Sequence, residues 1–412
     1  MPRRGEHGLW GHPDFLKLWA GQTISVFGSM VTAFALPVTA ILLLEATPLD
    51  ITLLGAAEIA PGLLVSLFAG AWVDRLRRRP VLIVADVCRA LLLGSIPAAA
   101  LLGVLRIELL YVVALLVSVC AVFFDVAYLS YLPTLVRRGN LLEGNSKLQA
   151  SASAAEVAGF GLGGALVQAL TAPIAILVDA ISFLVSAFSV AIIRRPEVPP
   201  AQSKGHQGTV RDIGLGIRFV QGERILWAGL GASATFNMFR SMVGVVIMLY
   251  LVRRLGMSPL ILGQLFAVGG ISAFLGAVLA GRLTRRWGVG PVMTGSLVLG
   301  GLATLLVPLA GGPMGAVLVA LGVSQLLGDG AATIYEINQV SLVQAKASKA
   351  MQGRVNASKR FADWAARLLG LLAGGLMGQA IGLRPTLFVA AAGGLLSVAW
   401  LLFSPVRRLR SP

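Results

Sequence analysis

The chain has 412 residues, of which 57% are hydrophobic and 13% are charged, and it carries a formal net charge of +16. A soluble domain of this length carries about twice that charged fraction, so the composition excludes an ordinary soluble protein with an oily core. The basic excess, with a pI of 11.1, leaves nucleic-acid binding open until the charges are placed along the chain.

Apolar runs bounded by charges, glycines and prolines predict membrane-spanning helices. The runs are long enough to cross a hydrocarbon core of roughly 30 Å. The twelve predicted spans lie at 18–44, 51–73, 81–103, 109–132, 148–170, 174–193, 225–252, 260–283, 291–310, 316–343, 356–380 and 385–404. The expected fold is therefore an all-α membrane protein.

One long polar connection separates the two halves of the chain. It contains PEVPP and QSKGHQG, followed by RDIGLGIRFVQGER, a pattern typical of a short amphipathic helix at a membrane surface. The expected organisation is an N-terminal six-helix bundle (1–193), a cytoplasmic linker with an interfacial helix (194–224) and a C-terminal six-helix bundle (225–412).

The basic residues are distributed unevenly between the two sides of the predicted membrane. The two termini and the connections on their side hold 27 of the 34 Lys and Arg residues. The remaining seven lie in the opposite connections or within spans: Arg106, Arg253, Arg254, Arg384, Arg89, Arg240 and Arg367. This asymmetry predicts that both termini and the linker are cytoplasmic. The high pI is then a topology signal, and nucleic-acid binding is not expected.

An internal repeat appears when the chain is displaced by 211 residues. GAWVDRLRRRP (70–80) then aligns with a segment that begins GRLTRRWG, and GFGLGG (159–164) aligns with GLLAGG (370–375). Two charged positions also align: Asp125 with Glu336, and Asp74 with Arg285. Because six spans separate equivalent positions, the halves have the same orientation and form parallel repeats about an axis along the membrane normal.

Six segments carry a family resemblance. They are GAWVDRLRRRP after the second span, DFLKLWAGQTISVFGSM (14–30), DVCRA (86–90), FFDVAYLSYLPTLV (123–136), LVDAISFLVSA (177–187) and GRVNASKRF (353–361). The chain resembles the major facilitator superfamily, more specifically the bacterial drug and siderophore exporters of the macrolide efflux and enterobactin exporter type. The resemblance covers essentially the whole chain and implies transport by alternating access.

Two positions depart from the family patterns. Arg77 stands where the signature between the second and third spans has its second glycine. The fifth-helix antiporter pattern keeps Gly159, Gly163 and Gly164 but has Phe160 in place of proline. This motif therefore does not by itself predict obligatory antiport, and its glycines are expected to serve close helix packing.

The resemblance implies a gating network of charges at the cytoplasmic end of the first half. Asp74, Arg75 and Arg78 of the signature belong to it, together with Asp125 of the fourth span. Such a network would hold the two halves together on the cytoplasmic side in the outward-open state. The alternative is a topology anchor that plays no part in gating.

Other charges near the cytoplasmic ends of spans are expected to be structural or to complete this network. The second half has Arg285 in place of the signature acid, and Glu336 is expected to neutralise Arg285 or Arg286. Structural roles are expected for Asp86, Arg89 and Asp179.

The charges deeper in the spans are the candidates for substrate or proton handling, because each costs roughly 3 kcal/mol to insert unless it is paired or hydrated. They are Asp329, Arg240, Glu58, Glu156, Asp363 and Arg367. A carboxylate shielded from water exchanges protons near neutral pH more readily than a hydrated one. Asp329 and Arg240 are preferred, since the resemblance implies that their spans line the central cavity. Asp363 and Arg367, four residues apart, are also placed to neutralise each other.

The spans contain no Ser-His-Asp, P-loop or Cys/His metal pattern, so neither an enzyme nor a cofactor nor a metal site is expected. Cys88 and Cys120 both lie in apolar spans. The leading hypothesis is a monomeric, proton-coupled exporter of a small amphipathic or hydrophobic compound (a drug, siderophore or secondary metabolite) in the lipid of the bacterial inner membrane. The alternatives are an importer or lipid flippase of the same fold, or a membrane sensor that does not transport.

Overall fold

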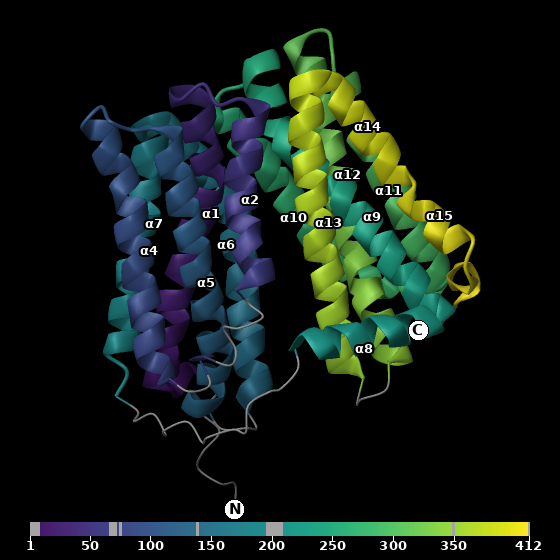
Figure 1. Ribbon diagram of the computed structural model, residues 1–412, viewed down its shortest axis with the longest axis horizontal. Coiled ribbons are helices and arrows are strands. Elements are labelled where there is room, and N and C mark those ends of the chain that lie inside the picture. The colour runs from purple at the N-terminus through teal and green to yellow at the C-terminus, as the bar shows by residue number, and fades with distance from the viewer. Residues whose placement is uncertain are drawn as a thin grey trace, which may run out of the picture. The chain divides into compact units, whose positions relative to one another are not determined.

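The computed structural model describes residues 9–65, 72–73, 76–136, 140–194, 209–347 and 351–410. Within these residues the regular secondary structure is entirely helical, with no strand (Figure 1). The predicted all-α fold is confirmed. The apolar runs form helices because a helix satisfies its own backbone hydrogen bonds, which a bilayer cannot do.

The helices of the first half follow the predicted spans. They are α1 (Pro13–Leu43), α2 (Pro48–Leu64), α4 (Arg78–Leu101), α5 (Ile107–Leu135), α6 (Leu141–Leu170) and α7 (Ala172–Ala191). A short 3₁₀ turn, η1 (Leu9–Gly11), precedes α1. The predicted second span, 51–73, continues beyond α2 into residues that lie mostly outside the described part of the chain.

The second half begins with the predicted amphipathic helix and continues with the remaining spans. Its helices are α8 (Thr209–Gly222), α9 (Arg224–Leu249), α10 (Pro259–Trp287), α11 (Val289–Leu309), α12 (Met314–Lys346), α13 (Gln352–Ala380), α14 (Leu383–Leu395) and α15 (Ser397–Leu402). A π turn, η3 (Tyr250–Arg254), extends α9, and a 3₁₀ turn, η4 (Pro405–Arg408), follows α15. The predicted last span, 385–404, is thus divided at Leu396.

Among the described residues, ten helical segments are long and apolar enough to cross a membrane. The two other predicted spans correspond to α2 and α13. The described part of α2 has 17 residues. The first half of α13 carries Arg354, Lys359, Arg360 and Asp363, which lower its hydropathy. The chain is a multi-pass membrane protein.

Two compact units make up the chain. The first contains Met1–Leu44 and Ala60–Gln207, and the second contains Glu45–Ile59 and Gly208–Pro412. The division falls inside α2, whose earlier residues pack in the second unit. There Thr52 lies against Gly375 of α13, at a position where a Cβ on the glycine would overlap the threonine side chain. The units therefore differ from the expected bundles by the residues Glu45–Ile59.

Within the first unit, α1 packs against α6 and α7, and α4 packs against α5 and α7. One apolar core at the end of these helices is built around Phe15, Phe124 and Tyr131, all of which are fully buried.

Within the second unit, α9 packs against α13, while α12 packs against both α10 and α11. Glycine allows the closest approach, since a Cβ at Gly370 of α13 would overlap the Met238 carbonyl oxygen of α9. Figure 1 shows α8 lying across one end of α13, where Gly216 is placed against the Arg354 carbonyl. These contacts hold α9, α12 and α13 in the arrangement that positions the polar cluster described next.

Candidate functional site

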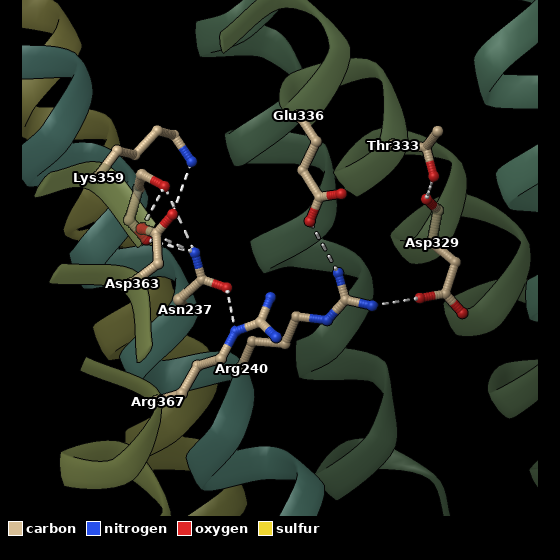
Figure 2. A network of polar contacts seen from close by, with 9 residues as sticks. Asn237, Arg240, Asp329, Thr333, Glu336, Lys359, Asp363 and Arg367 are labelled. Atoms are coloured by element: carbon tan, nitrogen blue, oxygen red, sulfur yellow. Dashed lines mark hydrogen bonds and ion pairs between the residues drawn. The ribbon is translucent and has the colours of Figure 1, made fainter. Parts of the chain in front are cut away.

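An arginine in the middle of α9 reaches two carboxylates of α12 (Figure 2). Arg240 Nη2 lies 3.5 Å from Asp329 Oδ1, and Nη1 lies 3.8 Å from Glu336 Oε1. The two acids are seven residues apart, so they lie on one face of the helix. The side chains of Arg240, Asp329 and Glu336 are 49%, 31% and 52% exposed, respectively. Ion pairs this open contribute about 0–1 kcal/mol, so Arg240 is held only loosely between its two partners.

Asp329 is the less exposed of the two acids because α10 approaches it closely. A Cβ at Gly269 of α10 would overlap the Asp329 carboxylate, and Gln325 lies beside it. Glycine at this position therefore leaves the space that the carboxylate occupies. The Thr333 hydroxyl donates to the Asp329 backbone carbonyl at 2.9 Å.

A second group of polar side chains joins α9 to α13, with Asp363 at its centre (Figure 2). Lys359 Nζ lies 2.6 Å from Asp363 Oδ2, and the Ser233 hydroxyl donates to Oδ1 at 2.7 Å. Asn237 donates to the same oxygen at 3.4 Å and accepts a hydrogen bond from Arg367 Nε at 3.0 Å. Asp363 thus pairs with Lys359, and Asn237 stands between this acid and Arg367, the residue that the spacing placed to neutralise it.

The two groups meet on α9, where Asn237 and Arg240 are three residues apart and so share a face. Together they contain three basic and three acidic side chains, all in the second unit: Arg240, Lys359, Arg367, Asp329, Glu336 and Asp363. We call these six residues, with Ser233 and Asn237, the α9 cluster. The structure thus brings together four of the six deep charges singled out from the sequence.

Sequence reasoning did not assign Ser233 and Lys359 to the site. Both are spaced four residues from another member of the cluster, Ser233 from Asn237 and Lys359 from Asp363. That spacing was the available signal, because residues four apart lie on the same face of a helix.

The remaining predicted site residues lie elsewhere. Glu58 is exposed on α2, Glu156 is exposed on α6, and Arg285 is exposed near the end of α10. Glu336, expected to neutralise Arg285 or Arg286, lies within ion-pair distance of Arg240 of α9.

The predicted gating network is only partly within the described residues. Arg78 is the first residue of α4, and Asp125 lies exposed on α5. Asp74 and Arg75 lie outside the described residues. The network therefore stays a prediction.

The first unit contains a charged pair of a different kind. Asp86 and Arg89 of α4 form a buried ion pair, with exposures of 0% and 7%. The guanidinium lies between two rings, 4.4 Å from the centroid of Phe124 and 4.1 Å from that of Phe183. The ion pair and the two ring faces compensate the buried charge, although Asp86 Oδ2 and Arg89 Nε have no hydrogen-bond partner among the described residues, and this arrangement suits a structural pair.

Asp179 of α7 is also buried, at a point where α1 comes close. The Ser182 hydroxyl lies 3.0 Å from Asp179 Oδ1 and 2.8 Å from the Asp179 carbonyl oxygen. A Cβ at Gly28 of α1 would lie 2.6 Å from the same carboxylate oxygen. Asp179 therefore lies at the contact between α1 and α7.

Across the described part of the chain, no group of three or more His, Cys, Asp or Glu side chains is placed to hold a metal ion.

Comparison with known proteins places this arrangement in a family. The chain is 28% identical over 407 residues to the multidrug efflux pump Tap of Mycolicibacterium fortuitum, covering 97% of this chain and 96% of Tap. It is 26% identical over 371 residues to the uncharacterized MFS-type transporter YfiS of Bacillus subtilis (strain 168), covering 89% and 87%.

Solved structures share the fold at lower identity. A bacterial homologue of the iron transporter ferroportin superposes with a TM-score of 0.76 at 19% identity, covering 94% of this chain and 98% of that one. The nucleoside transporter NupG superposes with a TM-score of 0.71 at 14% identity, covering 94% and 98%. Residues 18–359 match the family model of the Major Facilitator Superfamily. This chain is therefore a transporter that belongs to the Major Facilitator Superfamily.

Proposed function

We propose that this protein exports small amphipathic or hydrophobic compounds in exchange for protons, by alternating access in the bacterial cytoplasmic membrane. In this proposal the protein acts as a monomer, and both termini are cytoplasmic. The observation that carries the proposal is the loose pairing of Arg240 with Asp329 and Glu336 in the middle of membrane-spanning helices.

The exposure of these side chains indicates what they face. A guanidinium that is half exposed within a membrane span must contact water, because exposure to hydrocarbon is far too costly. The face of α9 that carries Arg240 therefore lines an aqueous path. Along such a path the acids are accessible both to protons and to a polar group of a substrate.

The weakness of the pairs suggests how substrate and protons compete. Protonation of Asp329 or Glu336 removes one partner of Arg240, and a cationic group of a substrate would displace the guanidinium from the same acid. A proton and a cationic substrate group therefore cannot occupy the same carboxylate at once, and the exchange of substrate for protons requires this exclusion. Only differential binding of the two ligands to two states of the transporter can drive such a cycle.

Two further observations support an amphipathic or hydrophobic substrate. In the first unit, an apolar groove of about 420 Å³ between α1 and α6 is lined by Ile24, Phe27 and Ala158 among other residues. This volume lies within the range of about 300–1,000 Å³ that small-molecule sites occupy. Similarity to the multidrug efflux pump Tap over nearly the whole chain favours export of such compounds.

The test is transport in proteoliposomes with ethidium, an amphipathic cation, as the probe. We expect an imposed proton gradient to drive ethidium accumulation by the unaltered protein. The variant Asp329→Asn should lose this gradient-driven accumulation yet retain ethidium counterflow. Glu108→Gln, which removes an acid in the first turn of α5, is the matched control and should behave as the unaltered protein.

Each other outcome rejects a defined part of the proposal. No gradient-driven movement of ethidium or of a panel of amphipathic drugs contradicts proton coupling. Accumulation only with the opposite gradient polarity favours an importer, and transfer of a fluorescent phospholipid between leaflets favours a flippase. Absence of counterflow for the whole panel favours a sensor that does not transport.

A further inference from the structure

The first unit has a second groove, which the α9 cluster does not explain. It lies between α4 and α5 and has a volume of about 480 Å³. Val84, Cys88 and Ala85 of α4 line one side, and Cys120 and Phe123 of α5 line the other. Apart from Arg77 at one end, the described lining residues are apolar or weakly polar.

The groove opens on the outer, apolar surface of α4. Val84 is 60% exposed, and Leu91, two turns further along the same face, is also exposed. In a membrane-spanning helix, an exposed face of this kind contacts acyl chains. Trp72 is exposed beside the groove, with its ring centroid 6.4 Å from that of Phe123. Tryptophan in such a position is typical of the level of the lipid headgroups.

The charged end of the groove is suited to an anion. Arg77 is exposed and directly precedes α4, whose N-terminal dipole also favours negative charge at this end. Arg79 is committed elsewhere, since its guanidinium donates to the Val190 carbonyl at 3.2 Å and to the Ala191 carbonyl at the end of α7. Arg77 is thus the side chain placed to neutralise a ligand that enters the groove.

No acid offsets this charge among the described lining residues. Asp125 of α5 lies two positions after Phe123, which places it on a different face of the helix. Arg77 also stands where the family signature has a glycine, so the cation is a feature of this chain. Its loop is predicted to be cytoplasmic, the side on which anionic lipids attract basic residues.

We propose that this groove binds one anionic phospholipid, with an acyl chain between α4 and α5 and the phosphate at Arg77. The apolar walls and Arg77, the one cationic residue among the described lining residues, match the two parts of such a molecule. The site is independent of what the protein transports, because it uses none of the residues of the α9 cluster.

The chain carries its own probe for this site. Cys88 and Cys120 are the only two cysteines in the sequence. Both are free thiols that line the groove. The rate of alkylation by N-ethylmaleimide under reducing conditions therefore reports whether the groove is filled.

The experiment compares nanodiscs of phosphatidylcholine with nanodiscs that also contain phosphatidylglycerol. We expect alkylation to be slower with phosphatidylglycerol by about fivefold, the effect of one basic side chain near an anionic headgroup. Arg77→Gln should abolish this difference. Arg286→Gln is the matched control, because it removes an exposed arginine at the end of α10 and should leave the difference intact.

A second measurement guards against effects of lipid on the reagent. Native mass spectrometry of the detergent-solubilised protein should show retained phosphatidylglycerol, and Val84→Trp, which fills the exposed side of the groove, should lose it. Equal alkylation rates in the two nanodiscs would overturn the proposal, as would equal lipid retention by the unaltered protein and Val84→Trp. Protection of the cysteines by ethidium in phosphatidylcholine alone would instead identify a substrate site.

Discussion

Arg89 and Arg240 both lie within membrane-spanning helices, yet their surroundings differ throughout. Arg89 is buried, with one acid on its own helix and an aromatic ring on either side. Arg240 is half exposed and spans two acids of a neighbouring helix at distances of 3.5 and 3.8 Å. A buried pair is costly to break, whereas an open one exchanges partners freely. The comparison separates a charge that holds helices together from one available for transport.

Removing Arg89 tests whether the buried ion pair stabilises the fold, and we expect it to have the largest effect on stability. Arg89→Ala leaves the Asp86 carboxylate buried without its partner, which should destabilise the protein by about 3–5 kcal/mol. We expect little folded protein in membranes and a markedly lower midpoint of thermal unfolding in detergent. Replacing both residues, Asp86→Leu with Arg89→Leu, should recover much of this loss. Equal stability of Arg89→Ala and the unaltered protein would contradict a structural role.

The two copies of the glycine motif offer a second comparison between the halves. Gly159 and Gly370 are equivalent in the 211-residue repeat. A Cβ at Gly159 would overlap the Cβ of Met30, whereas at Gly370 it would overlap the backbone carbonyl of Met238 more deeply. We therefore expect Gly370→Ala to destabilise the second unit by about 1–3 kcal/mol, the usual cost of overpacking, and Gly159→Ala to cost less.

Thermal unfolding of the two variants in detergent measures this difference. Gly94→Ala is the control, because a Cβ there has no other atom within 4 Å. It should leave stability unchanged or raise it by about 0.5–1 kcal/mol, since alanine favours the helix more than glycine does. A larger loss for Gly159→Ala than for Gly370→Ala would show that the depth of the overlap does not set the cost.

The sequence was sufficient for the helices because the bilayer sets their length and hydropathy. The sequence was not sufficient to predict which side chains of different helices pair with one another. Asp363 has a basic residue four positions away on each side, Lys359 and Arg367, and the spacing alone does not choose between them. The choice is made by α9, whose Asn237 takes the hydrogen bond from Arg367. The rings that enclose Arg89 come from α5 and α7, which no local pattern around Arg89 reveals.

The sequence also did not predict the unit in which the N-terminal part of α2 packs, again because packing partners are not visible in a local pattern. Hydropathy identifies a helix but not the unit in which it packs, and the N-terminal part of α2 lies with the second unit. Small residues decide this contact, since Thr52 and Gly375 fit only because one of them lacks a side chain. Charge asymmetry, which predicts topology, carries no information about such contacts.

Removing the charge of Arg240 has the smallest expected effect on stability and completes the comparison. Arg240→Gln should change the free energy of unfolding by no more than about 1 kcal/mol, because both ion pairs are open to solvent. Transport should nevertheless fall strongly, since Asp329 and Glu336 lose the cation with which a substrate competes. Arg240→Lys should recover only part of the rate, because a single ammonium cannot span both acids as the guanidinium does.

Ethidium counterflow and thermal unfolding, measured on the same preparations, separate these effects. The expected pattern is the reverse of that for Arg89: transport is lost while the unfolding midpoint is kept. A large fall in the midpoint of Arg240→Gln would make the α9 cluster a structural network like the buried pair of the first unit. Unchanged counterflow in a stable variant would remove Arg240 from the transport path.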